Sequence, residues 1–266
     1  MRLIDSHCHV NADRFADDAE QVLEAARDGG VERVLVPGWD IPSCERARDL
    51  AERVPWIDIA VGVHPHDAAK VDDAGWQRIV GWAADGRVLA IGETGLDYDR
   101  VFSPIPDQLT NLRRNLRLAS DTRKPVILHC RSGADQRDAQ DRLVDELSAL
   151  GTDRPRIVVH SFSGPVDYAE AMLDLGAVIS FSGLVFRTGE EASAAVARQT
   201  PGDRLLIETD SPFLAAPGAP KGRNEPAYVR ITGEWLATQR GVDPSALGDA
   251  LVTTYDRTFE RAQRPS

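Results

Sequence analysis

The segment LIDSHCH, residues 3–9, runs from a short apolar pair directly into two histidines that are two positions apart. Side chains on an extended strand alternate between its two faces, so Asp5, His7 and His9 are expected on one face. Two imidazoles at this spacing can ligate one metal ion, whereas buried imidazoles without an ion each need a separate polar partner. The segment therefore predicts a strand whose carboxyl end carries metal ligands.

The same arrangement recurs along the chain. Six further polar residues stand at or shortly after the end of a short apolar run: His64, His66, Glu93, His129, His160 and Asp210. Because the carboxyl ends of parallel strands meet on one rim of an α/β fold, these side chains are expected to lie close together.

Eight apolar runs are interpreted as strands, at residues 3–4, 31–36, 57–63, 88–91, 126–128, 157–159, 177–181 and 205–207. Segments with helical spacing of apolar residues lie between them, at 19–26, 109–119 and 143–150. This alternation predicts an α/β fold, a single (β/α)8 TIM-type barrel over residues 1–266 with an additional C-terminal helix over 245–261. The alternative is an open doubly wound sheet, which more often has a phosphate-binding glycine loop after its first strand.

Composition limits the functional classes. The formal net charge of -11 argues against a protein that coats nucleic acid with a broad basic face. It does not exclude a nuclease, because bound cations would add local positive charge. No leader or apolar run long enough to span a bilayer is recognisable, and the three cysteines lack CxxC spacing. We therefore expect a cytoplasmic protein without disulfides, membrane contact or an obligate protein partner, and a monomer.

The proposed ligands are too numerous for one tetrahedral ion. Four imidazoles and two carboxylates suit two divalent ions that share a bridging carboxylate. Zinc, manganese, nickel and magnesium all remain open as the metal. Cys8 and Cys130 stand beside ligand histidines, but strand alternation turns them toward the helices, where they are expected as small buried residues.

Eight motifs along the chain resemble those of the TatD family of metal-dependent deoxyribonucleases, which belongs to the amidohydrolase-type barrels. They occur in the family's order and cover nearly the whole chain: DSHCHV (5–10), GVHPH (within 61–66), GETGLDY (92–98), ILHCR (127–131), HSFSG (160–164), SFSG (180–183), ETDSPFL (208–214) and GRNEP (222–226).

The resemblance implies a TIM-type barrel with a two-metal centre that cleaves DNA, from single-stranded or frayed 3′ ends. It implies that His7 and His9 hold one ion with Asp210, that Glu93 bridges, and that His129 and His160 hold the second ion. The departures from the family pattern, at Thr94, Asp99 and Ser161, remove no ligand. Asp99 adds negative charge near the rim, which bears on substrate affinity.

The residues also suggest a mechanism. Two cations lower the pKa of a water, and Asp210 is the expected catalytic residue that orients this water and takes its proton. His64 is expected to donate to a substrate phosphate oxygen, with a loop cap as the alternative. Arg131 is expected to neutralise a phosphate, with a salt bridge to Glu93 or Asp97 as the alternative.

Further candidates lie beyond the last strand. Lys221 and Arg223, in the loop 217–226, are candidate contacts for a nucleic-acid backbone, although this loop could equally be a structural lid. Exposed aromatic rings that could stack on bases are not evident from the sequence, although Trp39, Tyr98 and Phe213 lie near strand ends; Phe213 is expected to pack in the core.

Two other functions are compatible with the pattern. The first is a small-molecule hydrolase that cuts an amide, ester or lactone with the same two-metal centre. Many such enzymes bridge their metals with a modified lysine, but Lys70, Lys124 and Lys221 do not stand at strand ends, so Glu93 has to bridge. The second is a noncatalytic metal-binding scaffold, which would be expected to lack Asp210 or a ligand.

Overall fold

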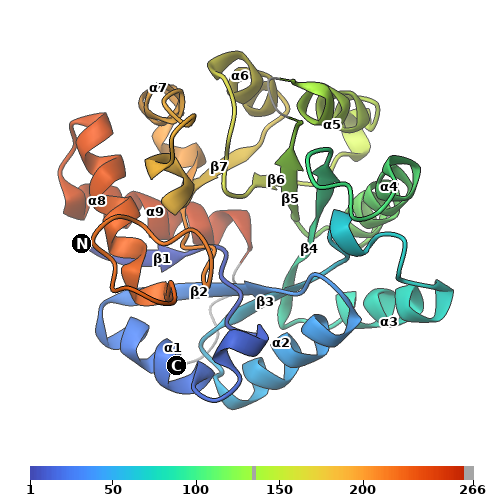
Figure 1. Cartoon of the computed structure of the whole chain (residues 1–266), viewed down its shortest axis with the longest axis horizontal. Coiled ribbons are helices and arrows are strands. Elements are labelled where there is room, and N and C mark those ends of the chain that lie inside the picture. Colours follow the sequence, from blue (N-terminus) through green and yellow to red (C-terminus); the bar gives the residue numbers. More distant parts are fainter. Residues whose placement is uncertain (134–135, 261–266) are drawn as a thin grey trace.

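The computed structural model describes residues 1–133 and 136–260. Its described part contains one parallel sheet whose strand order follows the chain from β1 to β8 (Figure 1). The strands are β1 Leu3–Asp5, β2 Val31–Pro37, β3 Asp58–Val61, β4 Val88–Asp97, β5 Val126–Arg131, β6 Ile157–Val159, β7 Val178–Phe181 and β8 Leu205–Ile207. All seven pairings between consecutive strands are parallel.

The first and last strands also meet. The backbone N–H of Ser6 donates to the carbonyl of Ile207 at 3.0 Å. Just beyond, the Asp5 carboxylate accepts hydrogen bonds from the N–H and the hydroxyl of Thr209, at 2.9 and 2.6 Å. The sheet therefore forms a nearly closed barrel, which confirms the predicted fold, and the open-sheet alternative is wrong.

Helices surround the strands on the outside of the barrel (Figure 1). They are α1 Ala19–Asp28, α2 Ile41–Arg53, α3 Asp73–Ala83, α4 Ile105–Thr122, α5 Asp138–Ser148, α6 Val166–Asp174, α7 Ser193–Gln199, α8 Val229–Arg240 and α9 Pro244–Thr258. Short 3-10 turns occupy Asp13–Phe15, Pro65–Asp67, Gly151–Asp153, Gly183–Phe186, Gly202–Arg204 and Pro226–Tyr228. The predicted C-terminal helix is α9, and position 261, its expected end, lies outside the described residues.

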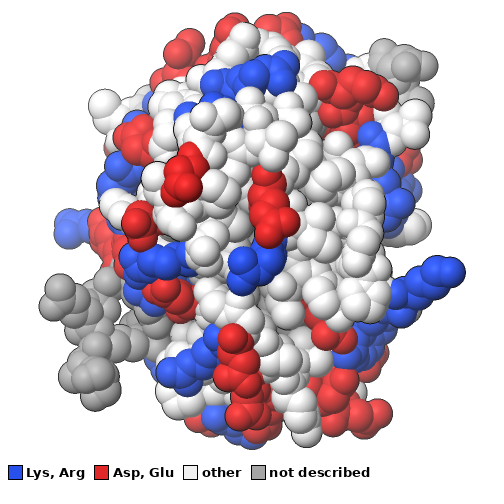
Figure 2. Space-filling model, turned by 90° about the vertical axis from the view of Figure 1, so that its left-hand side faces the viewer, with Lys and Arg blue, Asp and Glu red and all other residues white. Residues whose placement is uncertain are grey.

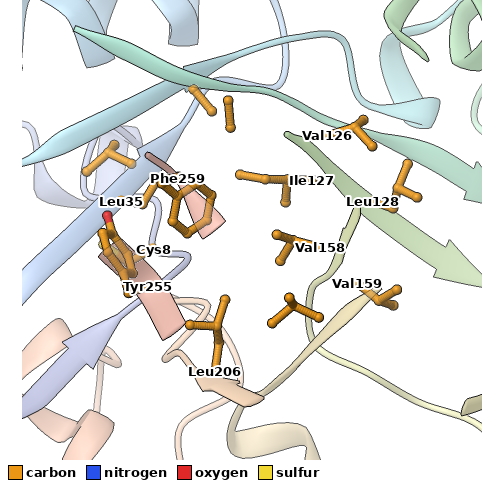
Figure 3. Packing of buried hydrophobic residues seen from close by; sticks show 14 of the residues in the cluster. Cys8, Leu35, Val126, Ile127, Leu128, Val158, Val159, Leu206, Tyr255 and Phe259 are labelled. Carbon is orange, nitrogen blue, oxygen red and sulfur yellow. The ribbon is translucent and has the colours of Figure 1, made fainter. Parts of the chain in front are cut away.

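The core explains why the apolar runs form the barrel. Val126, Ile127 and Leu128 of β5 are fully buried with the apolar residues of the neighbouring strands (Figure 3). Helix α9 adds buried aromatic rings, and the Tyr255 hydroxyl donates to Asp58, the first residue of β3, at 3.0 Å. Because α9 covers the amino ends of the strands, the open end of the barrel is the carboxyl end.

Two strands are longer than the apolar pattern predicts. Strand β4 continues six residues past the expected end at 91, and β5 continues to Arg131. The ladder between them includes the pairs Gly95 with His129 and Asp97 with Arg131. Polar side chains occur inside these strands because they face the open end of the barrel instead of the apolar core.

The described residues form no helix that is long and apolar enough to cross a membrane. Acidic and basic side chains alternate over the face shown in Figure 2, without a broad basic area on that face. This distribution is consistent with the net charge of -11.

Candidate metal centre

Glu93 of β4 lies at the centre of the predicted site. Its carboxylate is buried at the open end of the barrel, and each of its two oxygens faces a different set of imidazoles. Burial alone would raise the pKa of Glu93, but the neighbouring imidazoles, His160, His64 and His7 above all, lower it well below its ordinary value. The carboxylate is therefore held ionised, as a bridging ligand has to be.

The Oε2 atom of Glu93 faces the histidines that follow β1. The Nε2 atoms of His7 and His9 lie 3.3 and 3.5 Å from it, and 3.1 Å from each other. Asp210, which follows β8, places its Oδ1 atom 3.4 Å from the His9 nitrogen and 3.9 Å from that of His7. Four donor atoms from three strands thus converge on this side of Glu93.

The Oε1 atom of Glu93 faces β5 and β6. His160 Nε2 lies 2.9 Å and His129 Nδ1 3.3 Å from this oxygen, and the two nitrogens are 3.4 Å apart. The remaining nitrogen of each ring faces a second carboxylate. His160 Nδ1 lies 3.1 Å from Glu208, and His129 Nε2 lies 3.4 Å from Asp97. A carboxylate behind an imidazole fixes its tautomer and leaves the front nitrogen free to ligate a metal.

These distances fit divalent ions. A tetrahedral site with metal–ligand bonds of about 2.0 to 2.1 Å has ligand–ligand distances of about 3.3 Å. The donor atoms around Glu93 are separated by 2.9 to 3.9 Å. In addition, the Nε2 atoms of His7 and His9 face each other and two carboxylates while both Nδ1 atoms are buried without a hydrogen-bond partner in the described structure. Nitrogen lone pairs and carboxylates converge in this way around a cation.

Asp210 is held at the rim by an unusual backbone conformation. Its φ angle is 52°, in the left-handed region that non-glycine residues adopt at a cost in free energy. Its N–H donates to the carbonyl of His7 at 2.9 Å, and its own carbonyl accepts from the N–H of Phe213 at 2.9 Å. These bonds turn the carboxylate toward His9 and into the open end of the barrel, where it is partly accessible.

His64 is placed against the same carboxylate, with its Nε2 atom 3.3 Å from Glu93 Oε1. Its Nδ1 atom accepts a hydrogen bond from the N–H of His66 at 3.1 Å. Burial lowers the pKa of His64 to about 4, so the ring is neutral at pH 7. A neutral imidazole that accepts at Nδ1 carries its proton on Nε2, which makes this atom a hydrogen-bond donor. With Glu93 and His129, His64 also forms one of the groups that could hold a metal ion.

His66 serves a different purpose from His64. Its Nε2 atom lies 2.7 Å from Asp97 Oδ2, the same oxygen that faces His129. Burial would raise the pKa of Asp97, but interactions with His129 and His66 lower it well below its ordinary value. Asp97 therefore stays charged and orients a predicted ligand histidine.

Arg131 lies at the end of β5 with 48% of its side chain exposed, and it forms an ion pair with Asp99 at 3.0 Å. Neither of the salt bridges considered from the sequence, to Glu93 or to Asp97, is the one that forms. Both Arg131 and Arg100 line the cavity of about 510 Å³ that opens above Glu93. Within residues 1–133 and 136–260, Arg100 makes no ion pair.

One prediction beyond the last strand is wrong, and the contacts of Arg223 favour one of two alternatives. Phe213 does not pack in the core: it is 54% exposed at the rim of the cavity. Its turn, which directly follows Asp210, leaves the ring no apolar layer to enter. Arg223 is bound to Asp18 by two hydrogen bonds of 2.8 and 2.7 Å and to Glu225 at 2.9 Å, so it anchors its loop to the segment before α1, which favours the structural alternative for the loop 217–226.

The cysteines are not among the three possible metal-binding groups found in the described residues. Cys8 is buried in the core, and Cys130 is partly buried with its thiol against Tyr168. Two carboxylates of the site were missed from the sequence, Asp97 and Glu208. Both follow the period of two, since Asp97 lies four residues after Glu93 and Glu208 two before Asp210.

The fold and this pocket define the class of protein, a metal-dependent hydrolase built on a (β/α)8 barrel. The model of the family described as "TatD related DNase" matches residues 4–260. The chain belongs to this family, which confirms the resemblance found in the sequence.

Curated relatives and a solved structure support this family assignment. The chain is 35% identical, over 97% of its length and 98% of the relative's, to the "uncharacterized metal-dependent hydrolase YabD" of Bacillus subtilis. It is also 35% identical, over 97% of its length and 99% of the relative's, to the "3'-5' ssDNA/RNA exonuclease TatD" of Yersinia pseudotuberculosis. The crystal structure of YJJV, a TatD homologue from Escherichia coli, superimposes with a TM-score of 0.87 at 29% identity, covering 98% of this chain and 99% of that one.

Proposed function

We propose that this protein is a metal-dependent deoxyribonuclease that removes nucleotides from the 3′ ends of single-stranded or frayed DNA. One observation carries the proposal: the two oxygens of Glu93 face separate sets of imidazoles at ligand distances, which is the geometry of a carboxylate that bridges two ions. The relative named as a 3'-5' ssDNA/RNA exonuclease supports the choice of substrate.

The proposed ligands are His7, His9 and Asp210 on one side of Glu93, and His129 and His160 on the other. When bound, two divalent ions lower the pKa of water and stabilise negative charge on a phosphate. Asp210 is the proposed proton acceptor, because its carboxylate borders both the donor cluster and the cavity. The buried side chains of the barrel exclude other water from the reacting atoms.

His64 and Arg131 are the proposed contacts to the phosphate. The Nε2 proton of His64 points at the group of donors around Glu93 Oε1, so a phosphate oxygen that enters there can accept it. Arg131 borders the cavity from β5 and can present two parallel N–H donors to a phosphate, in competition with its partner Asp99.

The test measures activity metal by metal. The metal content of the purified protein is determined, the metal is removed, and zinc, manganese, nickel or magnesium is restored before incubation with single-stranded DNA that carries a label at its 5′ end. We expect stepwise shortening from the 3′ end and a loss of about 100- to 10,000-fold in Asp210→Ala. A metal-loaded protein that releases no nucleotide, with Asp210→Ala behaving identically, would refute the proposal.

A small-molecule hydrolase is the competing function. The same metal-loaded protein is therefore incubated with a panel of esters, lactones and amides. We expect no turnover that depends on Asp210 in this panel. Turnover there, without action on DNA, would favour the competing function.

The proposed setting follows from the barrel. Ligands from His7 to Asp210 share one pocket, which supports a single domain, and the nearly closed sheet leaves no free edge for pairing between copies. We propose a cytoplasmic monomer with DNA as its substrate and no obligate protein partner. Sedimentation of the metal-loaded protein at the mass of one chain, 29.1 kDa, is the expected result.

A further inference from the structure

Two exposed phenylalanines stand on opposite sides of the metal centre. Phe213 follows Asp210 by three residues, and its ring centre lies 6.2 Å from that of His9, on the Oε2 side of Glu93. Phe102 lies in the loop after β4, and its ring centre lies 4.7 Å from that of His66, which faces Asp97 on the Oε1 side. The two rings are 54% and 64% exposed, and each contacts a histidine that lines the cavity.

The backbone around Phe102 is fixed on both sides of the ring. Before it, the Asp97 carboxylate accepts the N–H of Arg100 at 2.8 Å. After it, the buried Ser103 hydroxyl donates to the carbonyl of His66 at 2.9 Å and accepts from the N–H of Ala69 at 3.1 Å. Val101 has a φ of 46°, a costly conformation for a β-branched residue, and the flanking bonds hold it. The exposed ring is therefore presented by an ordered loop.

The backbone around Phe213 is fixed in the same way. Its N–H donates to the carbonyl of Asp210 at 2.9 Å, and its carbonyl accepts from the side-chain amide of Asn224 at 2.6 Å. Asn224 is itself buried. Leu214, the next residue, has a φ of 50°. Two loops at the same end of the barrel thus each expose one aromatic ring to solvent.

Phe213 lines the cavity, and Phe102 contacts His66, which also lines it. Two arginines stand among the carboxylates of the lining. Arg100 directly precedes Val101 and lines the cavity, and Arg131 lines it from β5. Aromatic faces combined with cations along a groove are how proteins bind single-stranded nucleic acid without reading its sequence.

We propose that Phe213 and Phe102 each stack on one of the two nucleobases that flank the scissile phosphate. The proposal rests on the nuclease function above and adds a reason for the substrate class: a single strand exposes its base faces, whereas a duplex does not. Stacking of this kind tolerates every base, so the enzyme is expected to remove all four nucleotides at similar rates.

The test compares normal and base-free substrates. Phe213→Ala and Phe102→Ala are assayed on a single-stranded oligonucleotide and on the same oligonucleotide with abasic residues at its last two 3′ positions. We expect KM on the normal strand to rise by about 5- to 100-fold in each variant, with kcat changed by less than about twofold. On the abasic strand the variants and the wild type should have the same KM. Phe213→Trp and Phe102→Trp should restore the wild-type KM on the normal strand.

A binding measurement gives a second readout. In an Asp210→Asn background, which leaves the strand uncut, an oligonucleotide with 2-aminopurine at its 3′ end should lose fluorescence on binding, and Phe213→Ala or Phe102→Ala should weaken this quenching. The control is Val242→Ala, an apolar residue between α8 and α9 that is 41% exposed and lines a separate pocket with Met1 and Arg230. It should leave KM and quenching unchanged.

The outcomes separate the two proposals. The stacking proposal alone is overturned if the wild type cuts DNA and the alanine variants have the same KM as the wild type. It is also overturned if the alanine variants raise KM on abasic strands as much as on normal strands. A Phe102→Ala variant that changes the mass of the protein in solution, and not KM, overturns the assignment of Phe102. A protein that quenches 2-aminopurine through both rings but cuts no DNA overturns the proposed nuclease function and leaves the stacking intact.

Discussion

The two sides of Glu93 are built differently. On the Oε1 side, Glu208 is hydrogen-bonded to His160 Nδ1 at 3.1 Å, and Asp97 lies 3.4 Å behind His129 Nε2 without forming a hydrogen bond to it in the described structure. On the Oε2 side, the described structure provides no partner for the buried Nδ1 atoms of His7 and His9, whose rings are positioned by packing: His7 stacks on His160 at 3.9 Å between ring centres.

The difference matters for metal binding. A backing carboxylate orients an imidazole, fixes its tautomer and increases its basicity, and removing one typically costs 10- to 100-fold in metal affinity. The Oε2 side thus has one more proposed ligand, Asp210, whereas the imidazoles of the Oε1 side have carboxylates behind them. We expect the Oε1 side to bind its ion first and more tightly, and the Oε2 side, which includes Asp210, to be the exchangeable one.

The largest effect is expected from Glu93→Gln, which removes the group that both sides share. An amide cannot bridge two cations with two anionic oxygens, so both ions should bind more weakly. The loss of several kcal/mol of charge stabilisation should reduce kcat/KM by on the order of a thousandfold or more. Elemental analysis and a DNA cleavage assay check this. A variant that retains two ions and activity would show that Glu93 does not bridge.

Glu208→Gln should affect mainly the Oε1 side. The variant keeps the shape of the side chain but removes the charge behind His160, and we expect the affinity for the first ion to fall by about 10- to 100-fold. A competition titration against a chelator measures it. The matched control is Glu225→Gln, whose partner Arg223 lies outside the site. Equal losses at both ions would contradict the asymmetry.

Wild-type protein should release its ions in two steps. With increasing chelator, one equivalent should leave at about a tenfold lower chelator concentration than the other, because only one side has backing carboxylates. Activity should be lost with the first equivalent, since Asp210 is on the weaker side. Metal content and activity measured on the same samples check this. Simultaneous loss of both ions would show that the two sides of Glu93 do not differ in metal affinity.

His64→Asn should change substrate binding but not metal content. The hydrogen bond from His66 makes the Nε2 atom of His64 a donor, so its loss removes one hydrogen bond to the phosphate, and KM should rise by about 3- to 10-fold. Steady-state kinetics and metal analysis are measured together. If metal content falls as well, His64 is a ligand and the Oε1 side has three imidazole ligands.

The smallest effect is expected from Asp99→Asn. This change frees Arg131 from an exposed ion pair that is worth about 0.2 to 1 kcal/mol, so KM for DNA should decrease by about 1.5- to 5-fold. The decrease should shrink at high salt, because the interaction is screened. KM measured at two salt concentrations checks it, and an unchanged KM at low salt would show that Arg131 does not contact the phosphate.

Much of the fold was predictable because buried parallel strands are continuous apolar runs. The runs at 31–36, 126–128 and 205–207 mark β2, β5 and β8 closely. An apolar run does not reveal the part of a strand whose residues are polar. Strand β4 extends through Glu93 to Asp97, since its second half faces the pocket, and apolarity cannot reveal such a segment.

The residues of the site could be predicted from the sequence, but the distances between their side chains could not. Every proposed ligand reaches the centre around Glu93, because position at the end of a parallel strand is enough to place a residue on the common rim. The assignment of Glu208 and Asp97 behind particular rings depends on distances between different strands. The exposure of Phe213 depends on a turn in which Asp210 and Leu214 have positive φ angles, and the pattern of apolar residues does not predict such a turn.

The contact between Asp5 and Thr209 determines when the pocket can form during synthesis of the chain. Asp210 donates its N–H to His7, so the pocket contains groups from the first and the last strand of the barrel. A nascent chain on the ribosome lacks this neighbour until β8 has emerged. The pocket can therefore be complete only after nearly the whole barrel has been translated.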